Sequence, residues 1–238
     1  MNLLKKVYNI LLKEYGFQGW WPVTPMGGCR GEKPLAPIYG IAAKNDRQRL
    51  EIIFGAVLAQ NTQWKPNAEQ AIIELNRLNL IDINQILKVK HEVLAQAIKS
   101  SGYFNQKAKK LKNAAEFLKK YPIKKLMKMD LWESRNLLLN INGIGPETAD
   151  SILLYALDKQ IFVVDAYTRR IFENLGVIKH EADYDEIQKL FMDNLEHNHR
   201  IFNEYHALIV EHAKRYYNKK PYGKNDLLLN TIKTKSFK

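Results

Sequence analysis

The sequence has one cysteine and no long apolar run. Cys29 alone cannot close an internal disulfide, build a cysteine-rich zinc site or ligate an iron–sulfur cluster. No apolar run approaches the roughly 20 residues of a membrane-spanning helix, and the amino terminus lacks the pattern of a signal peptide. We therefore expect a soluble intracellular protein of the cytoplasm, and the sequence calls for no metal and no cofactor.

Acidic residues are scarce relative to basic ones. There are 25 Asp and Glu against 37 Lys and Arg, which gives a formal net charge of +12. Such an excess predicts a polyanionic partner, although a generally lysine-rich composition would produce the same excess. With 238 residues, of which 46% are hydrophobic, the chain can form one large or two small domains with their own cores.

Strand-like alternation is nearly absent, and the helical period dominates. Apolar residues recur at helical spacing near 3–12, 50–58 and 111–118. The short β-branched run Ile161–Val164 is interpreted as a buried connector between helices. Further helices are predicted over 64–79, 91–100, 130–140, 146–157, 166–175, 183–196 and 199–217.

Two stretches depart from the helical pattern and suggest how the chain is divided. Residues 16–46 are rich in glycine and proline, which predicts a long irregular segment. The basic tail 221–238 is interpreted as mobile or loosely docked. The predicted fold class is all-α and two-lobed, with a cleft between the lobes. Residues 47–160 form the central lobe, and 1–46 plus 161–220 form the second lobe from both chain ends.

The most informative motif is a tight turn, Gly143-Ile144-Gly145, followed by Pro146 at the start of a helix. Glycine permits positive φ and leaves no Cβ between the backbone and a close ligand, and proline suits the first turn of a helix. Backbone N–H groups beside such a turn point outward and predict a phosphate site that needs no basic side chain. An ordinary packing corner between two helices has the same pattern.

Asp165 follows the apolar residues Val163 and Val164 and stands at the start of a predicted helix. A carboxylate placed in this way is oriented and partly desolvated. It can act as a general base or stabilise a cation. The alternative role is a helix N-cap, which aspartate fills well, and the two roles are compatible.

Together these motifs resemble the signature of the endonuclease III superfamily of helix-hairpin-helix DNA glycosylases. The resemblance runs from about 50 to 216. It implies an enzyme of base excision repair that flips a damaged base out of double-stranded DNA and hydrolyses its N-glycosidic bond, since that bond is unreachable inside the duplex. Because monomers are the family habit, the resemblance also implies a monomer. The stretches that carry the resemblance are Gly143–Asp150, Val164–Arg170, Phe54–Thr62 and Ser101–Lys109.

The resemblance also implies roles for individual residues. Asp165 is the implied catalytic aspartate, which stabilises the oxocarbenium-like sugar and helps to activate water at C1′. Gln60 is the residue that enters the DNA stack where the base has left. Lys107 is the member of a lysine-rich stretch that we expect to meet DNA. The full set of expected DNA-binding residues is Gly143, Ile144, Gly145, Glu147, Thr148, Gln60, Asn61 and Lys107.

The chain departs from two groups within the family. Bifunctional members carry a lysine just after the hairpin glycines, where this chain has Glu147. A carboxylate cannot form a Schiff base, so we expect a monofunctional glycosylase without AP lyase activity. Other members end in four cysteines around an iron–sulfur cluster, and these are absent from 206–222. We interpret His206 and His212 in that region as ordinary buried or surface histidines rather than metal ligands.

A group of aromatic residues narrows the resemblance to the 3-methyladenine DNA glycosylase branch that lacks the cluster. Trp20, Trp21, Pro22 and Trp64 would line the base pocket, where a cationic alkylpurine gains about 0.5–2 kcal/mol from electron-rich rings. The alternative is that these aromatics are core residues. An alkylated purine is the expected substrate. Uracil or 8-oxoguanine is the alternative, and a non-catalytic DNA-binding protein is a further alternative.

Overall fold

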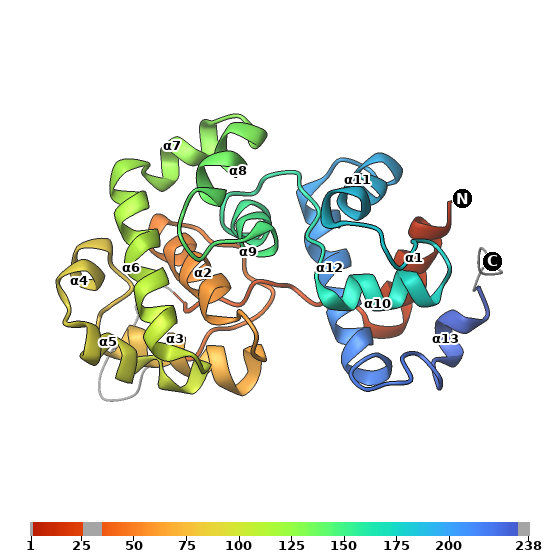
Figure 1. Ribbon diagram of the computed structural model, residues 1–238, viewed down its shortest axis with the longest axis horizontal. Helices are drawn as coiled ribbons and strands as arrows, with labels where there is room; N and C mark the ends of the chain where they lie inside the picture. The colour runs from red at the N-terminus through yellow and green to blue at the C-terminus, as the bar shows by residue number, and fades with distance from the viewer. Residues whose placement is uncertain (1, 26–34, 233–238) are drawn as a thin grey trace. The chain divides into compact units, whose positions relative to one another are not determined.

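The computed structural model describes residues 2–25 and 35–232 and confirms an all-α fold (Figure 1). Within these residues there is no β-strand, and Val23 and Ile38 form an isolated antiparallel bridge. No helix in the described part of the chain is long and apolar enough to cross a membrane. Cys29 lies outside the described residues.

The chain divides into two compact units. The central unit is Trp21–Lys159, and the terminal unit combines Met1–Trp20 with Gln160–Lys238. The sequence had assigned all of 1–46 to the second lobe, but the described residues after Trp20 belong to the central unit. The reason is a set of buried hydrogen bonds, because the backbone of Thr24 accepts from Gln48 Nε2 at 3.0 Å and donates to Glu51 Oε1 at 2.6 Å. A cleft between the lobes stays a prediction.

The central unit is built around α2, whose residues from Leu50 to Leu58 are all buried. Asn45 caps the helix by accepting a hydrogen bond from the backbone N–H of Gln48. Helices α3, α6, α7 and α9 and the segment η3 pack against α2. The helical segments of this unit are α2 Asp46–Leu58, η1 Trp64–Ala68, α3 Glu69–Arg77, α4 Ile83–Lys88, α5 His91–Ala97, η2 Lys99–Ser101, α6 Phe104–Lys120, α7 Ile123–Lys128, α8 Leu131–Leu139, α9 Pro146–Ser151 and η3 Ile152–Ala156.

The terminal unit pairs the two ends of the chain. Helix α1, red in Figure 1, packs on the blue helix α12, and α12 also packs on α10. The connector Ile161–Val164 is fully buried and forms no strand, as predicted from its apolar run. The helices of this unit are α1 Leu3–Tyr15, α10 Ala166–Asn174, α11 Tyr184–Asn194, α12 His199–Tyr216 and α13 Leu227–Asn230.

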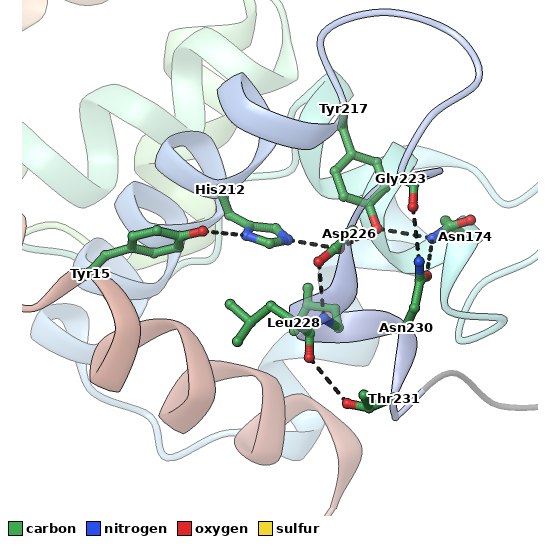
Figure 2. A network of polar contacts seen from close by, with 10 residues as sticks. Tyr15, Asn174, His212, Tyr217, Gly223, Asp226, Leu228, Asn230 and Thr231 are labelled. Carbon is green, nitrogen blue, oxygen red and sulfur yellow. Dashed lines mark hydrogen bonds and ion pairs between the residues drawn. The ribbon is translucent and has the colours of Figure 1, made fainter.

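The prediction of a mobile or loosely docked tail is wrong for residues 221–232. Asp226 is fully buried, and its carboxylate accepts hydrogen bonds from His212 Nε2 at 2.9 Å and from the Tyr217 hydroxyl at 2.9 Å. Tyr15 from α1 meets the other ring nitrogen of His212 at 2.8 Å. Figure 2 shows this chain of polar contacts, which joins α1, α12 and the tail. The lysine-rich composition of the tail indicated a solvated segment, but the buried carboxylate of Asp226 fixes it to the rest of the terminal unit.

Candidate active site and DNA-contact residues

The Gly-Ile-Gly turn connects α8 to α9 in the central unit. Gly143 has φ +93°, and the backbone N–H of Ile144 donates to Ile141 O at 3.0 Å to close the turn. Ile141 and Ile144 are buried, so the apolar residues of the turn hold it against the core. Gly145 and Pro146 remain exposed at the start of α9, where the first-turn N–H groups have no partner in the helix ladder.

A buried ion pair joins the two helices of this hairpin. Arg135 on α8 donates to both carboxylate oxygens of Asp150 on α9, at 2.8 and 3.1 Å. Both residues are buried. Such a bidentate pair fixes distance and angle together, so it sets how α8 and α9 present the turn between them.

Gln60, at the end of α2, is bound to the same turn. Its Nε2 donates to Gly143 O at 3.0 Å and to Thr148 Oγ1 at 2.9 Å. Its Oε1 accepts from Lys110 Nζ at 2.6 Å. The structure therefore brings together three elements that are far apart in the sequence: the end of α2, the middle of α6 and the hairpin. Asn61 follows Gln60 in an exposed position with φ +52°.

Asp165 caps α10 in the terminal unit. Its Oδ1 accepts hydrogen bonds from Thr168 N at 2.7 Å and from Thr168 Oγ1 at 2.8 Å, which confirms the N-cap role. The other oxygen, Oδ2, lies 3.8 Å from His206 Nε2 of α12, and the Asp165 side chain is 13% exposed. The buried connector before it and the cap after it orient the carboxylate and leave a small part of it open to solvent.

The predicted pocket aromatics are brought together only in part. Trp21 packs edge-on against Trp64, with ring centroids 5.2 Å apart, and against Tyr155 of η3 at 5.3 Å. Gly55 of α2 makes room for the pair, because a Cβ there would lie 3.0 Å from Trp21 Nε1. Pro22 is buried. Trp20 belongs to the terminal unit, where Lys214 Nζ lies 5.9 Å from its ring centroid.

Residues 54–197, more than half of the chain, match the HhH-GPD superfamily of base excision DNA repair proteins. The chain belongs to this superfamily. It is 44% identical over 223 residues to a Methanocaldococcus jannaschii protein named "Putative DNA repair glycosylase MJ1434". The aligned residues cover 92% of this chain and 90% of that protein. It is accordingly a DNA glycosylase of base excision repair.

Solved structures agree with the fold of this glycosylase. The H. pylori 3-methyladenine DNA glycosylase MagIII, bound to 1,N6-ethenoadenine, matches with a TM-score of 0.61 and 28% identity over 72% of this chain and 89% of that one. A trapped covalent intermediate of endonuclease III with DNA matches with a TM-score of 0.65 and 17% identity over 98% and 96% of the two chains. At 17% identity, the match to endonuclease III supports the fold alone.

The prediction that Lys107 meets DNA is wrong for this fold. Lys107 is 2% exposed, and its Nζ donates to the backbone carbonyls of Leu58 at 2.8 Å and Ser101 at 2.6 Å. Burial, with a smaller contribution from Lys110, lowers the pKa of Lys107 to about 8. The ammonium group thus joins the last residue of α2, two residues before Gln60, to the last residue of η2.

The sequence analysis gave no site role to three residues of these regions. Lys110 holds Gln60, and the aromatic ring of Tyr155 completes the packing around Trp21. Tyr103 is 67% exposed and adopts φ +47° just before α6, so its aromatic ring is open to solvent. An aromatic side chain in a turn was the available signal for Tyr103, but no local pattern distinguishes Lys110 from the lysines around it.

The described residues contain no group of three or more His, Cys, Asp or Glu side chains arranged to hold a metal ion. His212 is instead a member of the buried polar network of Figure 2. His206 lies beside Asp165. Both histidines therefore have a place in the fold that needs no metal.

The positive φ of Gly143 leads to a stability prediction with a matched control. In Gly143→Ala the new Cβ would lie 2.5 Å from Lys110 Cγ, at a φ that L residues avoid. We expect a loss of about 2–3 kcal/mol in the free energy of unfolding. Gly145→Ala meets nothing within 4 Å and should cost less than about 1 kcal/mol. Urea denaturation of both variants measures this, and equal losses would contradict the prediction.

Proposed function

We propose that this glycosylase is monofunctional and removes an alkylated purine from DNA, with Asp165 as its catalytic carboxylate. The observation that carries the proposal is the placement of Asp165. Thr168 binds Oδ1 and orients the group, while the charge remains close to a partly open surface. The resemblance of its sequence context to the family's catalytic aspartate supports the same role.

The reaction needs one carboxylate and one water molecule. As the glycosidic bond breaks, its electron pair leaves with the base and the sugar acquires oxocarbenium character. A fixed negative charge stabilises that cation. The oxygen of water then bonds to C1′, and the carboxylate of Asp165 accepts the proton. A cationic alkylpurine is already a good leaving group, so no strong acid is required beside the base.

Glu147 supports the monofunctional assignment. It is exposed in the first turn of α9, at the position where the family's bifunctional members carry the Schiff-base lysine. A carboxylate cannot attack C1′ to form an imine. Water is therefore the proposed nucleophile, and the abasic site is the proposed product.

The central unit would supply the contact with the DNA backbone. The backbone N–H groups of Gly145, Glu147 and Thr148 belong to the start of α9, where a phosphate is favoured by the helix dipole. Gln60 donates hydrogen bonds to Gly143 O in the turn and to Thr148 Oγ1 in α9. If Gln60 enters the DNA stack, it must first release these hydrogen bonds, which would couple DNA insertion to a change at the hairpin.

The choice of base rests on the aromatic pair Trp21 and Trp64. Electron-rich rings stack well on a positively charged purine, and the similarity to MagIII, solved with 1,N6-ethenoadenine, favours a modified purine. The close packing of the two rings favours a core role for Trp64, which is 6% exposed, so Trp21 is the better candidate to touch the base. Uracil and 8-oxoguanine remain the alternative substrates.

The experiment that tests the proposal is a panel of duplexes, each with one modified base. The panel contains 7-methylguanine, 1,N6-ethenoadenine, uracil, 8-oxoguanine and an unmodified control, with dimethyl-sulfate-treated DNA as the source of 3-methyladenine. We expect free alkylated purine and intact strands bearing abasic sites. Release of uracil or 8-oxoguanine alone would overturn the substrate assignment. A high yield of covalent adduct after borohydride addition would overturn the monofunctional assignment, and binding without any release would favour a non-catalytic protein.

A further inference from the structure

His206 is a titratable neighbour of the proposed catalytic carboxylate. It lies on α12, which packs against α10, and its Nε2 is 3.8 Å from Asp165 Oδ2. Its side chain is 13% exposed, and the Nε2 atom itself is buried. Because Thr168 occupies Oδ1 of Asp165, the histidine lies beside the carboxylate oxygen that the cap does not use.

Several other ionisable groups on the elements around His206 are engaged elsewhere. Glu204 accepts backbone hydrogen bonds from Gln18 and Gly19, and Tyr205 donates to Leu4 O. Arg169 donates to Ala182 O, and Arg170 donates to Tyr217 O. Further titratable residues on or near these elements make contacts of their own: Tyr8 on the Tyr205 ring, Tyr15 on His212, Tyr167 under Arg170, Tyr184 on Val164 N and Lys214 over Trp20. Asp165 is the charged group that acts on His206.

Two opposing effects determine the charge of His206. Burial lowers the pKa of its imidazole, and the nearby Asp165 carboxylate acts in the opposite direction with a smaller effect. The net pKa lies below the usual 6.5, so the ring is neutral at neutral pH. A neutral imidazole beside Asp165 does not offset the negative charge of the carboxylate.

We propose that His206 is a positioning residue for Asp165: the neutral ring packs against the carboxylate without compensating its charge, and a protonated ring would pair with it and weaken catalysis. This inference rests on the proposed function of Asp165. Stabilisation of the sugar cation depends on an uncompensated negative charge. A cation at 3.8 Å would oppose that stabilisation directly. The acid limb of base release is then set by the protonation of His206.

The sign of the pH effect follows from this arrangement. As pH falls through the lowered pKa of His206, the imidazolium forms and pairs with Asp165, so base release declines. Removing the imidazole removes that step, and release should continue to lower pH. One pH unit below the titration midpoint leaves about a tenth of the active form, which makes the shift measurable.

The test uses the full chain, a dimethyl-sulfate-treated duplex and single-turnover rates from about pH 4.5 to 8. In His206→Gln we expect the acid limb of base release to move to lower pH, so that the ratio of the rate at the acid end of this range to the rate near pH 7.5 rises over the wild type. In His206→Lys, which places a permanent cation there, we expect a lower rate across the whole range. His180→Gln is the matched control, because His180 is exposed and pairs with Glu173, and its profile should equal that of the wild type.

Two outcomes would overturn the inference. One is an equal loss of rate at every pH in His206→Gln, which a purely structural role would produce. The other is an acid-to-neutral rate ratio in His206→Gln equal to that of the wild type. A second readout is independent of activity: histidine ring resonances followed by NMR should show His206 titrating at still lower pH in Asp165→Asn, because the carboxylate that favours the imidazolium is gone. An unchanged titration would refute the coupling. If NMR shows the coupling but neither the wild type nor any variant releases base, the proposed function is refuted while the coupling of His206 to Asp165 stands.

Discussion

Asp165→Asn is expected to lower the rate of base release by at least about 100-fold while leaving DNA affinity within about threefold. The amide has nearly the shape of the carboxylate but carries no charge, so it cannot stabilise the sugar cation or accept the proton of water. Asparagine is as good an N-cap as aspartate, and its oxygen can still accept the hydrogen bonds from Thr168. Single-turnover release and DNA binding, measured on the same preparation, separate catalysis from recognition.

The matched control for this variant is Asp183→Asn. Asp183 caps α11 with a similar hydrogen bond to the backbone, from Glu186 N at 2.8 Å, but it lies on an exposed turn. The same chemical change there should leave base release unaltered. If Asp165→Asn keeps most of its activity, or loses binding and release together, the carboxylate is a helix cap and not the catalytic group.

The sequence was sufficient for the long helices but not for their interruptions. Apolar residues at helical spacing located α6, α11 and α12, because long amphipathic helices repeat the pattern over several turns. The predicted helix over 64–79 is broken at Lys65, whose φ and ψ are extended before Pro66. Short helices such as α4, α7 and α13 span too few turns to show a period, and they were missed.

The candidate sites were predictable where the chemistry is local. The turn at Gly143 and the cap at Asp165 each depend on residues adjacent in sequence. The glycine and the aspartate therefore predict a turn and a helix cap from the local sequence. Lys107 shows the limit of that reasoning, because its sequence neighbours do not reveal that the carbonyls of Leu58 and Ser101 surround its ammonium group. The sequence predicts a basic residue in a lysine-rich stretch to be exposed, because its hydrogen-bond partners elsewhere in the chain cannot be identified from its neighbours.

The boundary between the units was misplaced for a related physical reason. Residues 16–46 contain many turn formers, and composition alone cannot assign an irregular segment to a core. The assignment depends on Thr24, Gln48 and Glu51, which satisfy one another's polar groups inside the central unit. Burial raises the pKa of Glu51 despite hydrogen bonds from Asn76 and Thr24, which is a property of packing and not of sequence.

The tail is the element whose structure differs most from its composition, and it supports the second large prediction. Asp226→Ala is expected to lower the free energy of unfolding by about 3–5 kcal/mol. The substitution removes the acceptor shared by His212 and Tyr217 and leaves both groups buried without it. It also removes the cap of α13, where Leu229 N donates to Asp226 Oδ1 at 3.0 Å. Urea denaturation at neutral pH gives the loss directly.

The pH dependence of this network has a definite sign. Burial alone would raise the pKa of Asp226, but the hydrogen bonds from His212, Leu229 N and Tyr217 outweigh it and hold that pKa below its usual value. A carboxyl whose folded pKa lies below its unfolded pKa stabilises the fold above the unfolded value of about 3.9. The contribution is lost as pH falls through the folded pKa, so the wild type should lose more stability than Asp226→Ala on acidification below about pH 4.

Asp193→Ala provides the comparison that separates the buried network from ordinary surface charge. Asp193 pairs with Lys189 at 2.8 Å, and both side chains are more than half exposed. Its removal should change stability by no more than about 0.5 kcal/mol, because exposed ion pairs gain little in water. A similar small change in Asp226→Ala would mean that the tail contributes little to folding. The expected large loss would make Tyr15, His212 and Asp226 the polar core that joins the two ends of the chain.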